Sequence, residues 1–174
     1  RPRAPGSEVA ETPRMLATRC HVVLTSLFDA KAVASVYEGP DGLIAGGAGK
    51  LFIEMSTVGP RTQIALAKTV VGGGAAFLEC PVSGTTGPAR AGQLVGLLGG
   101  EHAGAERALP VLSKLCRRLA HMGPVGTGAV AKLAINLPLL AFWQSFGEAM
   151  ALMKGIGKAP EQLVVLFADT AGAP

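Results

Sequence analysis

The segment Gly128-Ala-Val-Ala-Lys132-Leu-Ala-Ile-Asn136 places an amine and a carboxamide four residues apart. Residues at this spacing lie on one face of a helix, so Lys132 and Asn136 would present their polar groups side by side. The flanking residues are apolar, and a partly desolvated lysine exchanges a proton closer to neutral pH. The spacing therefore predicts a proton-exchanging lysine beside an amide. A plainer interpretation is a helix whose lysine extends to water and whose asparagine bonds locally.

Two motifs upstream favour the chemical interpretation. The apolar run before Ser56-Thr57-Val-Gly-Pro60 predicts a buried strand with a loop at its carboxyl end. The segment Phe77-Leu-Glu-Cys-Pro-Val-Ser-Gly84 predicts a second strand that enters a small polar loop, followed by a helical turn over 88–92. Such loops offer backbone N–H groups that suit a carboxylate or phosphate. An ordinary strand-to-helix connection has the same composition and stays open as the alternative.

Together these motifs resemble those of the β-hydroxyacid dehydrogenase family, the relatives of 3-hydroxyisobutyrate dehydrogenase. That family carries a strand-end D-x-S-T, then D-A-P-V-S-G-G, then G-x-x-x-K-x-x-x-N. The corresponding segments here are 54–57 (E-M-S-T), 79–85 (E-C-P-V-S-G-T) and 128–136. The segment 89–94 with Gly99-Gly100 also resembles the family's A-x-x-G-x-L…G-G. The resemblance runs from about Val9 to the last residue.

The chain departs from the family pattern at four motif positions. Glu54 and Glu79 stand where the family has Asp, Cys80 where it has Ala, and Thr85 where it has the second Gly. None of these changes removes a group that the family uses chemically.

A larger departure concerns the G-x-G-x-x-G turn that receives the cofactor pyrophosphate in the family. Neither of the glycine clusters at 46–51 and 72–74 has its spacing. We therefore expect a partial chain that lacks the N-terminal G-x-G-x-x-G unit and most of the C-terminal helical domain. We also expect the 174 residues alone to bind NAD(P)H very weakly and to show no measurable dehydrogenase activity.

The resemblance implies an NAD(P)-dependent oxidoreductase, with NADP or NAD as cofactor. It would transfer a hydride between the nicotinamide and a small β-hydroxy acid or its aldehyde or ketone partner, such as a glyoxylate- or semialdehyde-type substrate. Lys132 would be the general acid/base and Asn136 would hold the same oxygen. Ser83 and Gly84 would bind the substrate carboxylate. The residues that would contact the cofactor follow two strand ends: Leu27, Phe28 and Thr57.

Two alternatives share this architecture. Imine reductases usually carry Asp or Tyr where Lys132 stands and lack the Ser-Thr strand end, so they fit less well. A non-catalytic relative, such as the nucleosome-associated glyoxylate reductase homologue, has lost the equivalent lysine. Lys132 therefore argues against both.

Strands and helices alternate along most of the chain. Strands are predicted at 21–27, 51–55, 77–82, 93–98 and 119–122, and helices at 30–37, 61–71 and 103–115. This alternation implies a partial Rossmann-like α/β fold with a mostly parallel sheet. From Gly128 onward the pattern predicts a long helix, kinked near Pro138, and a further helix over 161–167 that opens at Pro160.

We assign residues 1–126 to the second half of a dinucleotide-binding domain. Residues 127–174 would form the interdomain helix and the start of an all-α domain. In the resembling family this long helix usually meets a partner subunit, so we expect a homodimer or a higher homo-oligomer.

Composition limits the other function classes. The net charge is only +4, and the basic start has no interleaved aromatic residues, so we expect no nucleic-acid partner. The 3 cysteines are too widely spaced for a metal pair and odd in number, which argues against a disulfide framework. They favour the cytoplasm or another reducing compartment. The apolar stretch 133–153 contains Asn, Pro, Gln and Glu, so we expect a buried helix and no membrane span.

Overall fold

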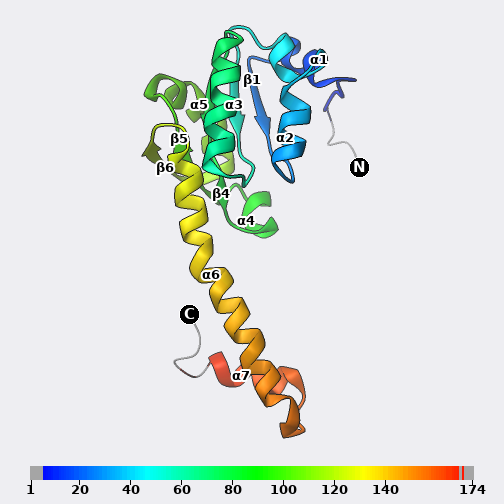
Figure 1. Ribbon diagram of the computed structural model, residues 1–174, viewed down its shortest axis with the longest axis vertical. Helices are drawn as coiled ribbons and strands as arrows, with labels where there is room; N and C mark the ends of the chain where they lie inside the picture. The colour runs from blue at the N-terminus through cyan, green and yellow to red at the C-terminus, as the bar shows by residue number, and fades with distance from the viewer. Residues whose placement is uncertain (1–5, 169, 171–174) are drawn as a thin grey trace. The chain divides into compact units, whose positions relative to one another are not determined.

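The computed structural model describes residues 6–168 and 170 and forms two compact units (Figure 1). The first unit ends at Lys132 and the second begins at Leu133, so the division falls inside one long helix, α6 (Thr127–Leu152). The first unit holds every strand of the described chain, and the second is helical.

The first unit is built on a six-stranded sheet in the order β1-β2-β3-β5-β4, with β6 pairing to β5. β1 runs parallel to β2, β2 to β3, and β5 to β6, whereas β3 and β4 pair with β5 in the antiparallel sense. The prediction of a mostly parallel α/β sheet is confirmed. The strands are β1 (Val22–Thr25), β2 (Leu51–Glu54), β3 (Ala76–Glu79), β4 (Val82–Ser83), β5 (Leu94–Gly99) and β6 (Cys116–Gly123).

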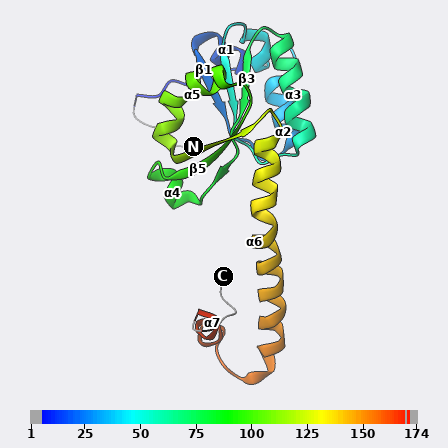
Figure 2. The ribbon, with the colours of Figure 1, turned by 90° about the vertical axis from the view of Figure 1, so that its left-hand side faces the viewer.

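Helices cover both faces of this sheet (Figure 2). The remaining elements of the first unit are α1 (Pro13–Arg19), α2 (Ala30–Tyr37), the 3-10 turn η1 (Leu43–Gly46), α3 (Pro60–Gly72), α4 (Thr86–Arg90) and α5 (His102–Leu115). The helices α2 and α3 pack on the strand residues Val23, Phe52 and Phe77. On the other face, α5 packs through Ala108 and Leu112 on Leu51, Ile53 and Leu78.

The pairing register explains where the apolar core stops. Val23, Phe52 and Phe77 are register partners on three neighbouring strands and face the same layer. Two residues further along each strand, on the same face, stand Thr25, Glu54 and Glu79. All three are buried. The carboxyl end of the sheet therefore carries a polar row directly beyond the apolar layer.

Several boundaries differ from the expectations. The single strand predicted over 77–82 is divided into β3 and β4 at Cys80-Pro81, because proline has no N–H to donate to a ladder. The last strand begins at Cys116, three residues before the predicted 119, directly where α5 ends. The helix α1 was not predicted, although Thr12 caps its amino end by accepting a hydrogen bond from Met15 N–H (3.2 Å) and Pro13 opens it.

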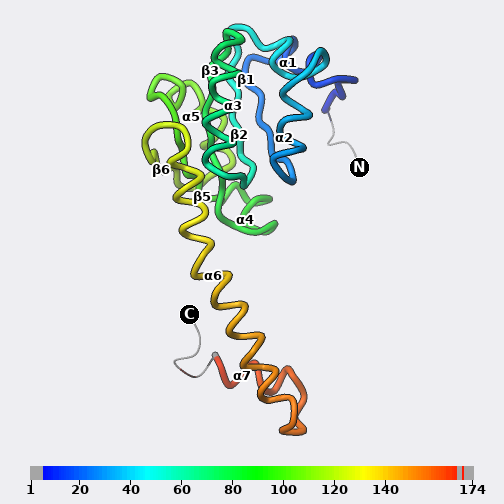
Figure 3. The backbone as a smooth tube through the Cα atoms, in the orientation of Figure 1, coloured from blue at the N-terminus to red at the C-terminus, as the bar shows by residue number. Residues whose placement is uncertain are grey.

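The second unit consists of α6 from Leu133 onward, the 3-10 turn η2 (Met153–Ile156) and α7 (Pro160–Ala168). Pro138 lies inside α6, whose backbone Figure 3 draws as a tube. Phe146 of α6 meets Phe167 of α7, with ring centroids 4.8 Å apart. The helix predicted over 161–167 is thus present and begins at Pro160.

The prediction that this apolar stretch is buried is wrong for the chain as described. The large exposed apolar side chains of α6 are Val130, Leu133, Ile135, Leu137, Leu139, Leu140, Trp143 and Leu152. Within the part of the chain that the structure describes, residues Thr127–Ile156 form one helix long and apolar enough to cross a membrane, by length and composition alone. The prediction of burial rested on the polar residues and the proline that interrupt the stretch, and the sequence cannot show which neighbour covers the apolar side chains.

Candidate active site

The polar row at the carboxyl end of the sheet holds the loops that follow β1 and β2. Glu54 accepts a hydrogen bond from the Thr25 hydroxyl (3.0 Å) and another from the Ser56 backbone N–H. The Thr25 hydroxyl also bonds the Tyr37 hydroxyl of α2 (2.8 Å), and burial raises the pKa of Tyr37. Glu54 therefore points into the protein and fixes the start of the loop that carries Thr57.

Ser56 joins this loop to its neighbour. Its hydroxyl oxygen accepts a hydrogen bond from Leu27 N–H (2.7 Å), so the loops after β1 and β2 are tied together. Leu27 is half-buried against the core, whereas Thr57 is exposed and the Phe28 side chain is 95% exposed. The three residues predicted to contact the cofactor thus lie on two connected loops at one end of the sheet.

Glu79, the next member of the row, holds a different element. Its Oε1 accepts hydrogen bonds from Gly126 N–H (2.6 Å) and Gly128 N–H (2.8 Å), at the amino end of α6. Burial raises the pKa of this carboxyl, and the bonds from Gly126, Gly128 and Ala129 oppose the shift. The start of the helix that carries Lys132 is therefore attached to the carboxyl end of β3.

Lys132 stands one helical turn beyond Gly128. It is half-buried, and desolvation lowers the pKa of its ammonium group from the ordinary value of 10.5. Asn136 is half-buried and lies four residues further along α6, so the predicted pair shares one helix. Lys132 closes the first compact unit and Asn136 belongs to the second.

A cavity of about 560 Å³ opens at the same end of the sheet. Its lining combines apolar and hydroxyl residues, which are Ser26, Met55, Val82, Gly84, Thr85, Thr86, Ala89 and Leu94. Of the predicted substrate-binding residues, Gly84 lines this cavity. Ser83 is half-buried on β4 beside it and, like Lys132, is absent from the lining.

Gly84 has a backbone conformation that only glycine adopts without strain. Its φ is +132°, and a Cβ there would come within 2.8 Å of Leu94 Cδ2 and 3.3 Å of Pro88 Cβ. The loop therefore requires glycine at this position.

Sequence reasoning missed three hydroxyl residues of the cavity: Ser26, Thr85 and Thr86. Ser26 directly follows β1, and Thr85 and Thr86 directly follow Gly84. Ser26 lies inside the strand predicted over 21–27, so the search would have had to include polar side chains in the last residues of each predicted strand and along the loop after it, because ligands in open α/β sheets bind at the strands' carboxyl ends.

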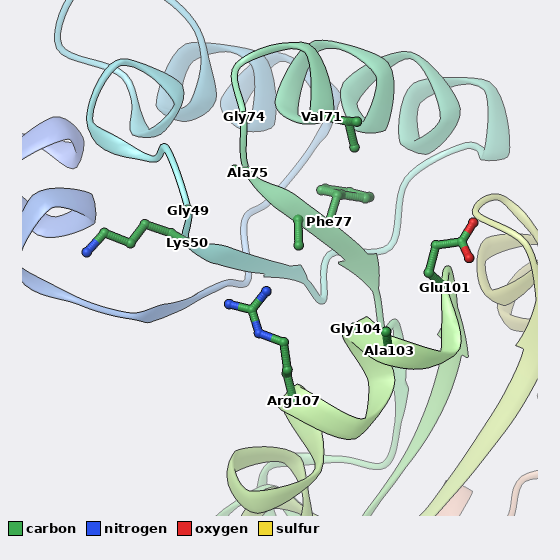
Figure 4. A pocket seen from close by; sticks show the side chains of 11 residues that line it. Gly49, Lys50, Val71, Gly74, Ala75, Phe77, Glu101, Ala103, Gly104 and Arg107 are labelled. Carbon is green, nitrogen blue, oxygen red and sulfur yellow. The ribbon is translucent and has the colours of Figure 1, made fainter.

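A second cavity, of about 400 Å³, lies at the amino ends of β2 and β3 (Figure 4). Lys50, Phe77 and Arg107 line it, and the Lys50 ammonium and the Arg107 guanidinium point in different directions in that view. No predicted site residue borders this cavity. Because open α/β sheets bind their ligands beyond the carboxyl ends of the strands, this cavity lies at the opposite end from the candidate site.

None of the three cysteines lines the cavity of the candidate site. All three are free, and Cys80 and Cys116 are buried. Both thiols lie beside Gly96 of β5, where a Cβ would come within 2.8 Å of the Cys80 sulfur and 3.2 Å of the Cys116 sulfur. Burial raises the pKa of Cys80 to about 12, so this thiol stays protonated and unreactive near neutral pH.

The parallel strands, the loops tied at their carboxyl ends and the anchored helix define the class of protein: a Rossmann-like dinucleotide-binding α/β domain. Comparison with known families agrees, because a family model described as the NAD binding domain of 6-phosphogluconate dehydrogenase matches residues 3–123. The chain belongs to this family.

Individual relatives point in the same direction. The chain is 36% identical to 3-hydroxyisobutyrate dehydrogenase of Pseudomonas aeruginosa, over 96% of this chain and 56% of the relative. It is 32% identical to the chloroplastic glyoxylate/succinic semialdehyde reductase 2 of Arabidopsis thaliana, over 95% of this chain and 47% of the relative. The chain thus spans about half the length of the curated relatives it matches.

A solved structure shows the same fold. The 3-hydroxyisobutyrate dehydrogenase of Mycobacterium tuberculosis with L-serine matches with a TM-score of 0.77 and 26% identity. The match covers 95% of this chain and 56% of that one. The resemblance inferred from the three motifs is therefore confirmed at the level of family and fold.

Proposed function

We propose that the protein is an NAD(P)-dependent β-hydroxyacid dehydrogenase. The observation that carries this proposal is Lys132: a half-buried lysine with a lowered pKa, on a helix whose amino end is attached to the carboxyl end of the sheet. A lysine with a lowered pKa exchanges its proton at a pH closer to neutrality than an exposed lysine does. The names of the relatives supply the substrate class, small hydroxy acids and their carbonyl partners.

In the oxidative direction, Lys132 would accept the proton of the substrate hydroxyl. Asn136 would donate a hydrogen bond to the same oxygen. The substrate carboxylate would accept hydrogen bonds from the Ser83 hydroxyl and the Gly84 N–H. The hydroxyls of Ser26, Thr85 and Thr86 add polar groups to the wall of the adjoining cavity.

The loops after β1 and β2 support a site for the nicotinamide half of the cofactor at this end of the sheet. The Ser56–Leu27 hydrogen bond fixes two loops that present an exposed aromatic ring, Phe28, and an exposed hydroxyl residue, Thr57. Such a surface suits a planar, hydrogen-bonding ligand. The cofactor, NAD or NADP, would supply the hydride acceptor when bound.

We further propose that the protein works in the cytoplasm or another reducing compartment, since all three cysteines are free. Its partners would be small carboxylate substrates and a second copy of the chain. The exposed apolar side chains of α6 support self-association, because apolar surface of this extent marks interaction sites.

An imine reductase is the nearest alternative. Lys132 and the Ser56-Thr57 strand end favour the hydroxyacid enzyme, because they supply a proton acceptor for an alcohol and match the hydroxyacid motifs.

The test is an oxidation assay with the complete protein. NAD+ and NADP+ are each combined with 3-hydroxyisobutyrate, with another small β-hydroxy acid and with the methyl ester of the first, and NAD(P)H formation is followed by absorbance. A parallel arm offers a cyclic imine and NADPH. We expect turnover of the free acids in preference to the ester. Turnover of the imine alone would contradict the proposal.

A further inference from the structure

Glu79 stands out among the buried polar groups because of the element that it bonds. Glu79 and Glu54 are register partners on β3 and β2, and both are fully buried. Glu54 bonds residues of its own and the neighbouring strand ends, whereas Glu79 bonds backbone amides 47 and 49 residues further along the chain. The proposed chemistry uses neither carboxylate.

The bonds from Glu79 satisfy the amino end of α6. The first backbone N–H groups of any helix lack partners within that helix, and a carboxylate placed there also meets the positive end of the helix dipole. Here one oxygen, Oε1, accepts from both Gly126 and Gly128. The other oxygen, Oε2, has no hydrogen-bond partner among the described residues. The hydrogen bonds that this buried carboxyl accepts therefore come from the amino end of α6.

The packing leaves little freedom to this contact. A Cβ at Gly128 would collide with the Leu97 carbonyl oxygen and come within 3.1 Å of Glu79 Oε1, and a Cβ at Gly99 would collide with Glu79 itself. The carboxyl is thus enclosed between β5 and the first turn of α6. Lys132 follows Gly128 by four residues, about 6 Å along the helix axis. A shift of the first turn would move the lysine with it.

We infer that Glu79 is the positioning residue of Lys132: by holding the amino end of α6 against the sheet, it keeps the lysine in its half-buried place. The inference concerns the geometry of Lys132, and it gains its catalytic meaning from the proposed function. A substitution that keeps an oxygen acceptor at residue 79 preserves this geometry, and one that removes the acceptor releases it.

The test uses NMR of the isotope-labelled complete protein and needs no enzymatic activity. Glu79→Met keeps the length of the side chain and removes the acceptor, whereas Glu79→Gln keeps an acceptor oxygen. Glu54→Gln is the matched control, because it changes a buried carboxylate in the adjacent strand that does not bond α6. Two quantities are measured: amide hydrogen exchange at Gly126 and Gly128, and the pKa of Lys132 from its ε-methylene resonances, assigned with Lys132→Arg.

In Glu79→Met we expect exchange at both glycines to accelerate at least about tenfold, since each loses its hydrogen bond. We also expect the Lys132 pKa to rise toward 10.5, its ordinary value. Glu79→Gln and Glu54→Gln should retain the slow exchange and the lowered pKa. A folded Glu79→Met chain with an unchanged Lys132 pKa would overturn the inference.

If Glu79→Met does not fold, the unsubstituted chain still decides. As the pH is varied, the amide proton resonances of Gly126 and Gly128 should move together with the Glu79 carboxyl resonance, because they bond the titrating oxygen. Independent titration would overturn the inference. A dehydrogenase assay of the complete parent protein and of its Glu79→Met variant adds a separate result. If the NMR results are as expected but the parent protein has no activity, the proposed function is contradicted and the role of Glu79 still stands.

Discussion

At the scale of single residues, the departures of this chain from its family's motifs have a structural explanation. Glu54 and Glu79 replace aspartates, and both carboxylates turn inward to accept backbone N–H bonds at the ends of loops and helices. They hold the neighbouring loops and the start of α6, and none of the proposed reacting groups, on Lys132, Asn136, Ser83 and Gly84, belongs to them. The extra methylene of each glutamate therefore changes the support of the site and not its reacting groups.

Ser83 provides a prediction at this scale. In the complete protein, Ser83→Ala should raise KM for a carboxylate substrate by about 10- to 150-fold, since a hydrogen bond to a charged group is worth about 1.5–3 kcal/mol. Steady-state kinetics with a free acid and its uncharged ester measure the difference. Equal effects on the two substrates would mean that Ser83 serves only the turn after β4.

At the scale of the elements, α3 carries an unusual residue on its inner face. Gln63 is fully buried, and neither its amide nitrogen nor its oxygen has a hydrogen-bond partner among the described residues. The other buried residues of this face are Leu66 and Val70, which join the apolar core. A buried polar group without a partner destabilises the folded state.

Gln63→Met should therefore increase the free energy of unfolding, by about 1–3 kcal/mol, since it removes two unpaired polar atoms at similar volume. Urea denaturation compares this variant with Gln93→Met, a matched change at an exposed position. A loss of stability in Gln63→Met beyond that of the control would show that the amide finds partners in solution.

The elements also show how far sequence reasoning reached. The alternation of strands and helices gave the right elements because each buries one periodic apolar face, as in α2, α3 and α5. The antiparallel pairing of β5 with β3 was not predicted, since strand direction depends on tertiary pairing that periodicity does not encode. Pro81 indicates the break between β3 and β4, but the mostly apolar run over 77–82 favoured the prediction of one continuous strand.

The candidate site was predictable for a different reason. The family motifs predicted a site at Gly84 and at the loops after β1 and β2; in the structure Gly84 lines a cavity and the two loops are tied together at the carboxyl end of the sheet. The links between these loops were not predictable. The bond from Leu27 to Ser56 and the bonds from Gly126 and Gly128 to Glu79 join residues distant in sequence, and only the fold brings them together.

At the scale of the whole molecule, Glu79 gives the stability a pH dependence. Burial raises the pKa of Glu79 in the folded chain above the ordinary value of 4.5. At pH values between 4.5 and the folded-state pKa, the folded chain therefore holds a proton that the unfolded chain has released. Its contribution is complete at pH values below 4.5 and is lost as the pH rises through the folded pKa. The Glu79→Gln variant has no titrating carboxyl group at this position and therefore serves as the reference.

The free energy of unfolding of the parent chain, relative to Glu79→Gln, should therefore decline as the pH rises from 4.5 toward neutrality. Urea denaturation at a series of pH values measures this difference, with Glu38→Gln as a control substitution at an exposed position. A difference that grows in favour of the parent chain as the pH rises would mean that the amide bonds outweigh burial at Glu79.

The central claim for the whole molecule is that Lys132 performs the proton transfer of a β-hydroxyacid dehydrogenase. The most direct measurement is kcat for the oxidation of a small β-hydroxy acid by the complete protein and by Lys132→Ala, alongside cofactor affinity from fluorescence titration. Lys132→Arg serves as a control that keeps the positive charge without a group that titrates in this range. We predict that Lys132→Ala and Lys132→Arg both lower kcat by about 10²–10⁴-fold while cofactor affinity stays near that of the parent. A Lys132→Ala protein that turns over at close to the parent rate would contradict the account.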